Sequence, residues 1–207
     1  MAEPISRRGF LVQSALYGSS LWVLLNVPRP RAVAAARAST HHEVLTDAEW
    51  TTVEAITSRI IPTDHEPGAV EANCVNFIDK ALAHEDAAMK PLYRSGVAAV
   101  DAVSRRRFAK SFVELTADER DEILVALESD KADGWPVASA ASPAKFFEMV
   151  RAHTIMGFLA HPKYGGNRDY AGWRVTGYPG GGHHLGGYSP EQLMGKEKIK
   201  TAWGDEV

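Results

Sequence analysis

The sequence predicts an all-α protein, a bundle of about five helices followed by a glycine- and aromatic-rich extended segment. Helix start signals recur along the chain, and apolar residues follow them at the spacing of a buried helix face. No run of alternating β-branched residues is long enough to form a sheet. The 207 residues suffice for one domain, which we place at residues 39–207 behind a separate N-terminal piece of residues 1–38.

The first helix is predicted to begin at a capping box formed by Thr46 and Glu49. In such a box the threonine hydroxyl accepts a free backbone N–H, while the glutamate side chain reaches back to the N-cap. A linker over residues 39–45 precedes this helix, and Pro62 ends it before the polar loop of residues 63–68. Its buried face is predicted to consist of Trp50, Val53, Ile56, Ile60 and Ile61.

Four more helices complete the predicted bundle. Two are expected over residues 76–82 and 93–108, because apolar residues recur there at helical spacing. Thr116 and Glu119 repeat the capping box and open the fourth helix. The fifth begins at Ser142, which provides an N-cap and is followed by a proline in the first turn.

The composition changes after this last helix. Residues 161–187 hold nine of the seventeen glycines, and aromatic residues lie between them at Tyr164, Tyr170, Trp173 and Tyr178. One interpretation is a surface loop whose aromatic side chains pack on the bundle. The other is a partner interface, in which glycines let the backbone approach another protein closely and Tyr and Trp act as anchors. The composition favours the interface, since a flexible linker would be rich in Gly and Ser instead.

The N-terminal piece has the layout of an export signal. Arg7 and Arg8 form a twin-arginine pair ahead of an apolar run over residues 9–27, and small residues follow at 32–38. This pattern predicts transport of the folded protein into the periplasm by the twin-arginine (Tat) translocase. The apolar run is also close to the ~20 residues that span a bilayer, so an uncleaved membrane anchor stays open as the alternative.

The remainder of the chain is acidic. Without residues 1–38 it carries 18 basic and 25 acidic side chains, a net charge of about -7. This charge argues against nucleic acid as a partner, because phosphate binding needs a basic surface. The basic run at residues 105–107 is interpreted as a solvated helix face. The single cysteine, Cys74, excludes an internal disulfide and a Cys-x-x-Cys-His haem attachment, and we expect a buried, unreactive thiol.

The usual cofactor motifs of an oxidoreductase are missing from the sequence. The glycine clusters at residues 180–182 and 186–187 follow no predicted strand and open no helix, as a dinucleotide-binding turn would. We therefore assign no catalytic, cofactor-binding or metal-binding residue to this chain. The alternative is a stand-alone periplasmic enzyme or metal-binding protein built around four histidines: His153, His161, His183 and His184.

Two stretches of the chain carry a family resemblance. The first reads HPKYGGNRDYAGW at residues 161–173 and continues with GYPG at residues 177–180, and the second is IIPTD at residues 60–64. Together they resemble the gluconate 2-dehydrogenase subunit 3 family, whose signature is Pro-x-Tyr-Gly-Gly-Asn, then Gly-Trp, then Gly-(Tyr/Phe)-Pro-Gly. A twin-arginine start is typical of the same family.

The resemblance implies a non-catalytic small subunit of a periplasmic, membrane-associated sugar or sugar-acid dehydrogenase. In such complexes FAD belongs to a large subunit of the glucose-methanol-choline type, and a cytochrome c subunit with haem c often passes electrons to the quinone pool. The small subunit is needed for maturation of the large one and for its export through the Tat translocase. We expect the partner interface to include seven residues: Tyr164, Gly165, Gly166, Asn167, Trp173, Tyr178 and Pro179.

Overall fold

The computed structural model of the chain describes residues 42–180 and 187–206. Arg7 and Arg8 of the predicted export signal, and His183 and His184, lie outside these residues. The described residues form helices and no strand, apart from an isolated bridge between Lys200 and Glu206. The predicted all-α class is therefore confirmed. None of the described helices combines the length and the apolar character needed to cross a membrane.

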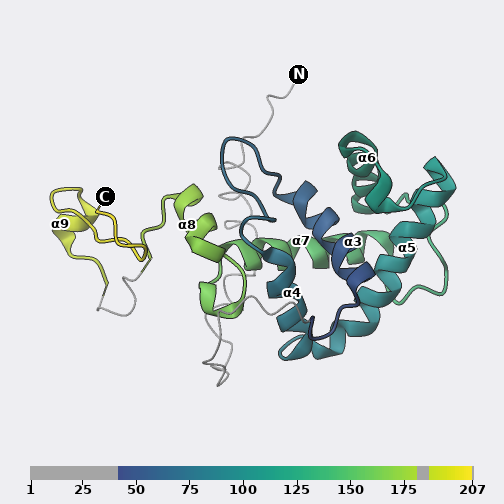
Figure 1. Cartoon of the computed structure of the whole chain (residues 1–207), viewed down its shortest axis with the longest axis horizontal. Coiled ribbons are helices and arrows are strands. Elements are labelled where there is room, and N and C mark those ends of the chain that lie inside the picture. The colour runs from purple at the N-terminus through teal and green to yellow at the C-terminus, as the bar shows by residue number, and fades with distance from the viewer. Residues whose placement is uncertain (1–41, 181–186, 207) are drawn as a thin grey trace.

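Five longer helices form the bundle, and α7 lies at its centre (Figure 1). Helix α7, which is the predicted fifth helix, packs against each of the other four. Two 3-10 turns, η1 (Ala87–Met89) and η2 (Phe112–Glu114), connect neighbouring helices. The five helices are α3 (Asp47–Ile60), α4 (Cys74–Ala83), α5 (Lys90–Phe108), α6 (Ala117–Glu128) and α7 (Pro143–Leu159).

The three helix starts that were predicted from capping residues are confirmed by their geometry. The Thr46 hydroxyl accepts the backbone N–H of Glu49 at 3.3 Å, and the glutamate carboxylate accepts the Thr46 N–H at 2.8 Å. The same reciprocal pair of bonds opens α6 at Thr116. Ser142 caps α7 by accepting the N–H of Lys145 at 3.3 Å. These bonds satisfy backbone donors that have no partner inside a helix.

The main core lies between the five helices. Burying an aliphatic or aromatic side chain of this kind stabilises a fold by about 1.5–3 kcal/mol. A smaller cluster around Phe158 and Cys74 joins α7 to α4 and to the segment that follows α7. Side chains from every main helix are fully buried in the main core, among them Val53, Ile56, Ile78, Leu82, Val100, Ile123, Leu127, Phe146 and Val150.

Two smaller predictions about side chains are also confirmed. Cys74 is fully buried, and burial raises the pKa of its thiol far above the ordinary range, which keeps the thiol protonated and unreactive. Arg105, Arg106 and Arg107 are exposed on the last turn of α5. Their partners are acidic side chains on the surface, so this run is a solvated helix face.

Candidate partner interface

After α7 the chain folds into short helical turns. Residues 161–180, which we call the motif segment, contain η3 (Pro162–Tyr164), η4 (Arg168–Tyr170) and α8 (Ala171–Thr176). This differs from the extended conformation expected from the sequence. The chain reverses direction because Gly165, Asn167, Asp169 and Tyr170 adopt positive φ, at 97°, 46°, 55° and 59°.

Asn167 connects the two ends of the turn. Its side chain is fully buried, and its amide Nδ2 donates to the carbonyl of Ala160 at 2.8 Å. Its Oδ1 accepts the backbone N–H of Gly172 at 2.9 Å. One side chain therefore satisfies a carbonyl after α7 and an amide in the first turn of α8. Asparagine is suited to this position because it tolerates positive φ and offers both a donor and an acceptor.

Two glycines of the motif segment lie directly against the backbone of α7. A Cβ atom on Gly166 would lie 2.2 Å from the carbonyl oxygen of Gly157, and one on Gly172 would lie 1.8 Å from that of Phe158. Real Cβ atoms do not approach carbonyl oxygens so closely, so only glycine fits at these two positions. The close approach is continued by Gly165, whose carbonyl accepts from Nδ2 of Asn76 on α4 at 2.8 Å.

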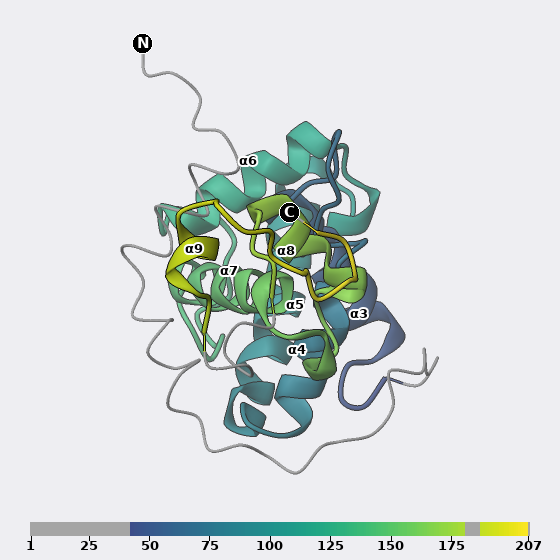
Figure 2. The same ribbon diagram turned by 90° about the vertical axis from the view of Figure 1, so that its left-hand side faces the viewer.

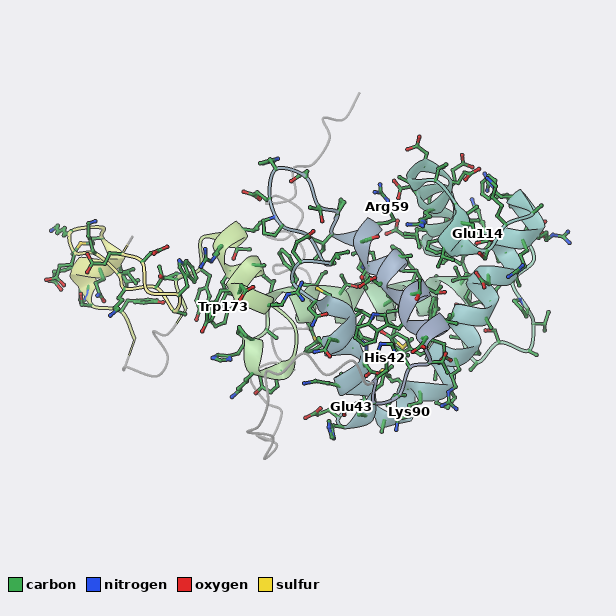
Figure 3. The ribbon with its side chains drawn as sticks, in the orientation of Figure 1. His42, Glu43, Arg59, Lys90, Glu114 and Trp173 are labelled. Atoms are coloured by element: carbon green, nitrogen blue, oxygen red, sulfur yellow. The ribbon has the colours of Figure 1, made fainter. Side chains whose placement is uncertain are left out.

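Trp173 is the aromatic centre of the motif segment (Figure 3). It is only 8% exposed, and its Nε1 donates to the carbonyl of Leu159 at 2.7 Å. Three rings surround it at centroid distances of 5.6, 5.4 and 5.0 Å, those of His161, Tyr170 and Tyr178. Such ring pairs stabilise by about 0.5–1.5 kcal/mol beyond their buried area. Trp173 therefore holds the segment together from inside.

A loop far away in the sequence joins the motif segment. Arg168 donates its backbone N–H to the carbonyl of Ala72 at 3.0 Å, and its Nε donates to the carbonyl of Glu71 at 3.0 Å. The Glu71 carboxylate in turn accepts from the Thr63 hydroxyl at 2.6 Å and from the N–H of Gly68 at 2.8 Å. The hydrogen bond from Thr63 lowers the pKa of Glu71, which keeps this carboxylate charged. Residues 61–73 and the motif segment thus form one unit, which we call the composite surface.

The composite surface combines apolar exposure with a strained backbone. Val70 and Tyr164, each 38% exposed, add large apolar side chains to the surface of this unit. Four of the six non-glycine residues with positive φ in the described chain belong to this unit: Asn73, Asn167, Asp169 and Tyr170. Each such residue costs about 1–3 kcal/mol, persists only where its surroundings fix it, and is most common at functional sites.

Beyond the motif segment the chain continues as a C-terminal arm, residues 187–206, which includes α9 (Pro190–Leu193). The view in Figure 2 shows the arm in front of α8, with the bundle behind. The arm is attached through the motif segment. Tyr188 donates its hydroxyl to the carbonyl of Gly180 at 2.7 Å, and Ala202 donates its N–H to that of Pro179 at 2.7 Å.

Comparison with known proteins shows the family of this chain. The family model of gluconate 2-dehydrogenase subunit 3 matches residues 47–180, from α3 to the end of the motif segment. This chain belongs to the gluconate 2-dehydrogenase subunit 3 family. The resemblance noted in the sequence is therefore confirmed, and the family name places the chain in a multi-subunit dehydrogenase complex. Neither the curated proteins nor the solved structures gave a match.

The structure brings the seven predicted interface residues of this family member into one segment, in different environments. Gly166, Asn167 and Trp173 are buried and support the fold of the segment, while Gly165, Tyr178 and Pro179 are half-buried. Tyr164 presents the one large exposed side chain of the seven. Contact of these residues with a partner stays a prediction.

Two residues that contribute to the composite surface were not predicted from the sequence. Val70 adds exposed apolar surface, and Arg168 ties the loop to the motif segment. A signal for the loop was present in the IIPTD stretch at residues 60–64, which carried part of the family resemblance. Its proximity to the motif segment could not be inferred, because no local pattern encodes a contact between residues 97 positions apart.

Two of the four histidines considered as ligands in this subunit 3 protein, His153 and His161, lie in the described residues and have identified contacts. His153 is 4% exposed, its Nδ1 lies 2.8 Å from the Tyr93 hydroxyl, and its Nε2 lies 3.5 Å from Oδ2 of Asp86. His161 accepts the N–H of Lys163 at its Nδ1 and packs edge-on against Trp173. Within residues 42–180 and 187–206, no three His, Cys, Asp or Glu side chains are grouped to hold a metal. Among the described residues no observation favours the histidine-based alternative, and His183 and His184 lie outside them.

His153 is expected to make stability depend on pH. Burial lowers its pKa, and the charge of Asp86 acts in the opposite direction. Since the unfolded histidine has a pKa of about 6.5, the unfolded state binds more protons below that pH. The contribution is therefore fully present above pH ~6.5 and is lost as the pH falls towards the folded pKa, by up to about 1.4 kcal/mol per pH unit.

The measurement is urea unfolding between neutral and mildly acidic pH. His153→Gln does not titrate, so its free energy of unfolding should fall less steeply than that of the wild type over this range. Asp86→Asn removes the charge that raises the pKa of His153. The free energy of unfolding of this variant should therefore keep falling to a lower pH than that of the wild type. Parallel curves for the wild type and His153→Gln would contradict this assignment.

Proposed function

We propose that this chain is the non-catalytic small subunit of a membrane-associated, FAD-dependent sugar or sugar-acid dehydrogenase. It binds the flavoprotein subunit, supports its maturation and takes it through the Tat translocase to the periplasm. Membership of the subunit 3 family and the twin-arginine pair Arg7-Arg8 support this proposal. The observation that carries it is the composite surface, where Arg168 of the motif segment binds Glu71, 97 residues away, and Glu71 in turn binds Thr63 of the IIPTD stretch.

The proposal assigns FAD to the partner subunit. A dinucleotide site needs glycines whose backbone is open to a pyrophosphate. The space beside Gly166 and Gly172 is instead filled by carbonyl groups of α7, so these glycines leave no cradle for a phosphate. The family resemblance assigns the flavin to a glucose-methanol-choline type subunit and haem c, where present, to a cytochrome subunit. The role of this chain is then binding, and the sugar chemistry belongs to the partner.

The composite surface has the properties of a preorganised interface. Its backbone is fixed by Asn167, by the glycine contacts with α7 and by Arg168, so little conformational freedom is left to lose on binding. Val70 and Tyr164 then provide exposed apolar groups on a rigid support. Aromatic side chains in such positions are frequent hot spots of protein–protein binding.

Replacing either exposed group is expected to weaken binding of the flavoprotein without unfolding this chain. Tyr164→Ala and Val70→Ser should each raise the dissociation constant by about tenfold, the effect of losing one moderate hot spot. The test is a tagged pull-down from membrane and periplasmic fractions, with flavin absorbance near ~450 nm reporting the companion subunit.

The matched control is Val125→Ser on α6, which removes an equally apolar group that is 63% exposed outside the composite surface. This variant should bring down as much flavin as the wild type. Equal flavin recovery from all four proteins would exclude the composite surface as the interface. A wild-type chain that is recovered folded and without any flavoprotein would contradict the proposed function itself.

A further inference from the structure

A buried carboxylate holds the chain immediately before the first helix. Asp79 of α4 is 1% exposed, and its two oxygens accept three consecutive backbone N–H groups. The Glu43 N–H lies 2.5 Å from Oδ2, while those of Val44 and Leu45 lie 3.0 and 2.7 Å from Oδ1. The linker interpretation of residues 39–45 is therefore wrong for residues 43–45, which are fixed to the domain.

Contacts on both sides of Asp79 reinforce this arrangement. Leu45 is buried in the main core, and the ring of His42 stacks on Trp50 with centroids 4.0 Å apart. Glu43 lies 3.4 Å from Nε2 of His84, just after α4. Residues 42–45 are thus held against the domain and lead directly into the cap of α3.

Asp79 and the amides of residues 43–45 depend on one another, and both need the folded domain. A buried carboxylate is costly unless hydrogen bonds compensate it, and a buried amide without an acceptor is costly as well. Both costs are avoided only when α4 has formed and residues 43–45 lie against it. Charge-assisted bonds of this kind are also stronger than those between neutral groups.

Helix α4 also supports the composite surface, from a neighbouring position. Asn76, one turn before Asp79, donates to the carbonyl of Gly165 in the motif segment. In Figure 3, His42 and Glu43 lie beside α4 and α5, whereas Trp173 lies towards α8. One ten-residue helix therefore fixes the start of the domain and the motif segment relative to each other.

We propose that Asp79 is a positioning residue for the predicted export signal of residues 1–38: it fixes residues 43–45, through which the signal is joined to the domain. The chain that follows the export signal is then fixed at one defined place on α4, while the motif segment, held by the same helix, binds the flavoprotein. This inference rests on the proposed escort function. It adds that presentation of the export signal depends on the three hydrogen bonds to Asp79, which exist only in the folded domain.

Hydrogen exchange on the full-length chain tests the anchor directly. In Asp79→Ala the amides of residues 43–45 should lose at least about tenfold of their protection, because opening of this segment no longer breaks three bonds. Asp79→Asn keeps one acceptor oxygen and should give an intermediate loss if the alanine variant folds poorly. The matched control is Asp101→Ala, since Asp101 accepts the N–H of Phe112 at 2.9 Å and does not touch residues 43–45.

Export is measured in the same strains, by the amounts of this chain and of flavin in the periplasm. The Asp79 variants should reduce export severalfold while still binding the flavoprotein in the cytoplasm, and Asp101→Ala should export normally. Normal export from an Asp79 variant with unprotected junction amides would overturn the proposal and leave the escort function intact. A wild-type chain without any flavoprotein partner would refute the escort function, whereas unchanged protection in Asp79→Ala would refute the anchor alone.

Discussion

Gly172→Ala is expected to destabilise the motif segment more than the same change at any other described glycine, because its Cβ would make the closest contact. The new Cβ would lie 1.8 Å from the carbonyl oxygen of Phe158, which belongs to the last turn of α7. A backbone carbonyl cannot rotate away as a side chain can, so α8 must move off α7. Overpacking commonly costs 1–3 kcal/mol, and we expect a loss above about 3 kcal/mol here.

Urea unfolding of the variant measures this cost, and flavoprotein pull-down measures its effect on the composite surface. A suitable control is Gly204→Ala in the C-terminal arm, where nothing lies within 4 Å of the added Cβ. That position has a φ of 99°, so the control still carries the penalty of positive φ, roughly 1 kcal/mol. A Gly172 variant no less stable than this control would mean that α8 does not need its close contact with α7.

The two glycine contacts show what the sequence could and could not predict. Residue pairs such as Thr46 and Glu49 predict a helix start because capping is local chemistry, and the three starts predicted from a capping residue are confirmed. The enrichment of glycine after α7 predicted that the backbone approaches another group closely, but it did not predict which group. The composition favoured a partner interface over packing on the bundle, and the structure places Gly166 and Gly172 against this chain's own α7.

Boundaries without a capping signal were harder to predict. Helix α5 begins at Lys90, three residues before the predicted start at Tyr93, because it continues from η1 in α-helical geometry. Met89 stands at its N-cap without a side-chain bond, so no polar residue marked the start. The apolar periodicity from which the start was predicted begins only where the helix face turns inward.

Contacts across long sequence separations were not predictable at all. The bond from Asn76 to Gly165 spans 89 residues, and those from Asp79 to residues 43–45 span 34–36. Nothing in the neighbourhood of Asp79 distinguishes it from a solvated helix aspartate. Only the folded structure reveals that this carboxylate is buried and holds the start of the domain.

Asn167→Ala is the second change with a large expected effect. It removes the donor to Ala160 and the acceptor for Gly172, and each buried group left without a partner costs about 1–3 kcal/mol. Alanine must also occupy a φ of 46°, which asparagine tolerates better. The free energy of unfolding should therefore fall by more than about 3 kcal/mol.

A second asparagine separates these causes. Asn73 also has positive φ, at 57°, but its side chain makes no capping bond, so Asn73→Ala isolates the backbone cost and should lose only about 1 kcal/mol. Asn167→Asp keeps the acceptor for Gly172 and places a carboxylate oxygen against the Ala160 carbonyl, so it should be nearly as harmful as alanine. If Asn167→Ala costs no more than Asn73→Ala, the motif asparagine is required for its backbone conformation and not for its two hydrogen bonds.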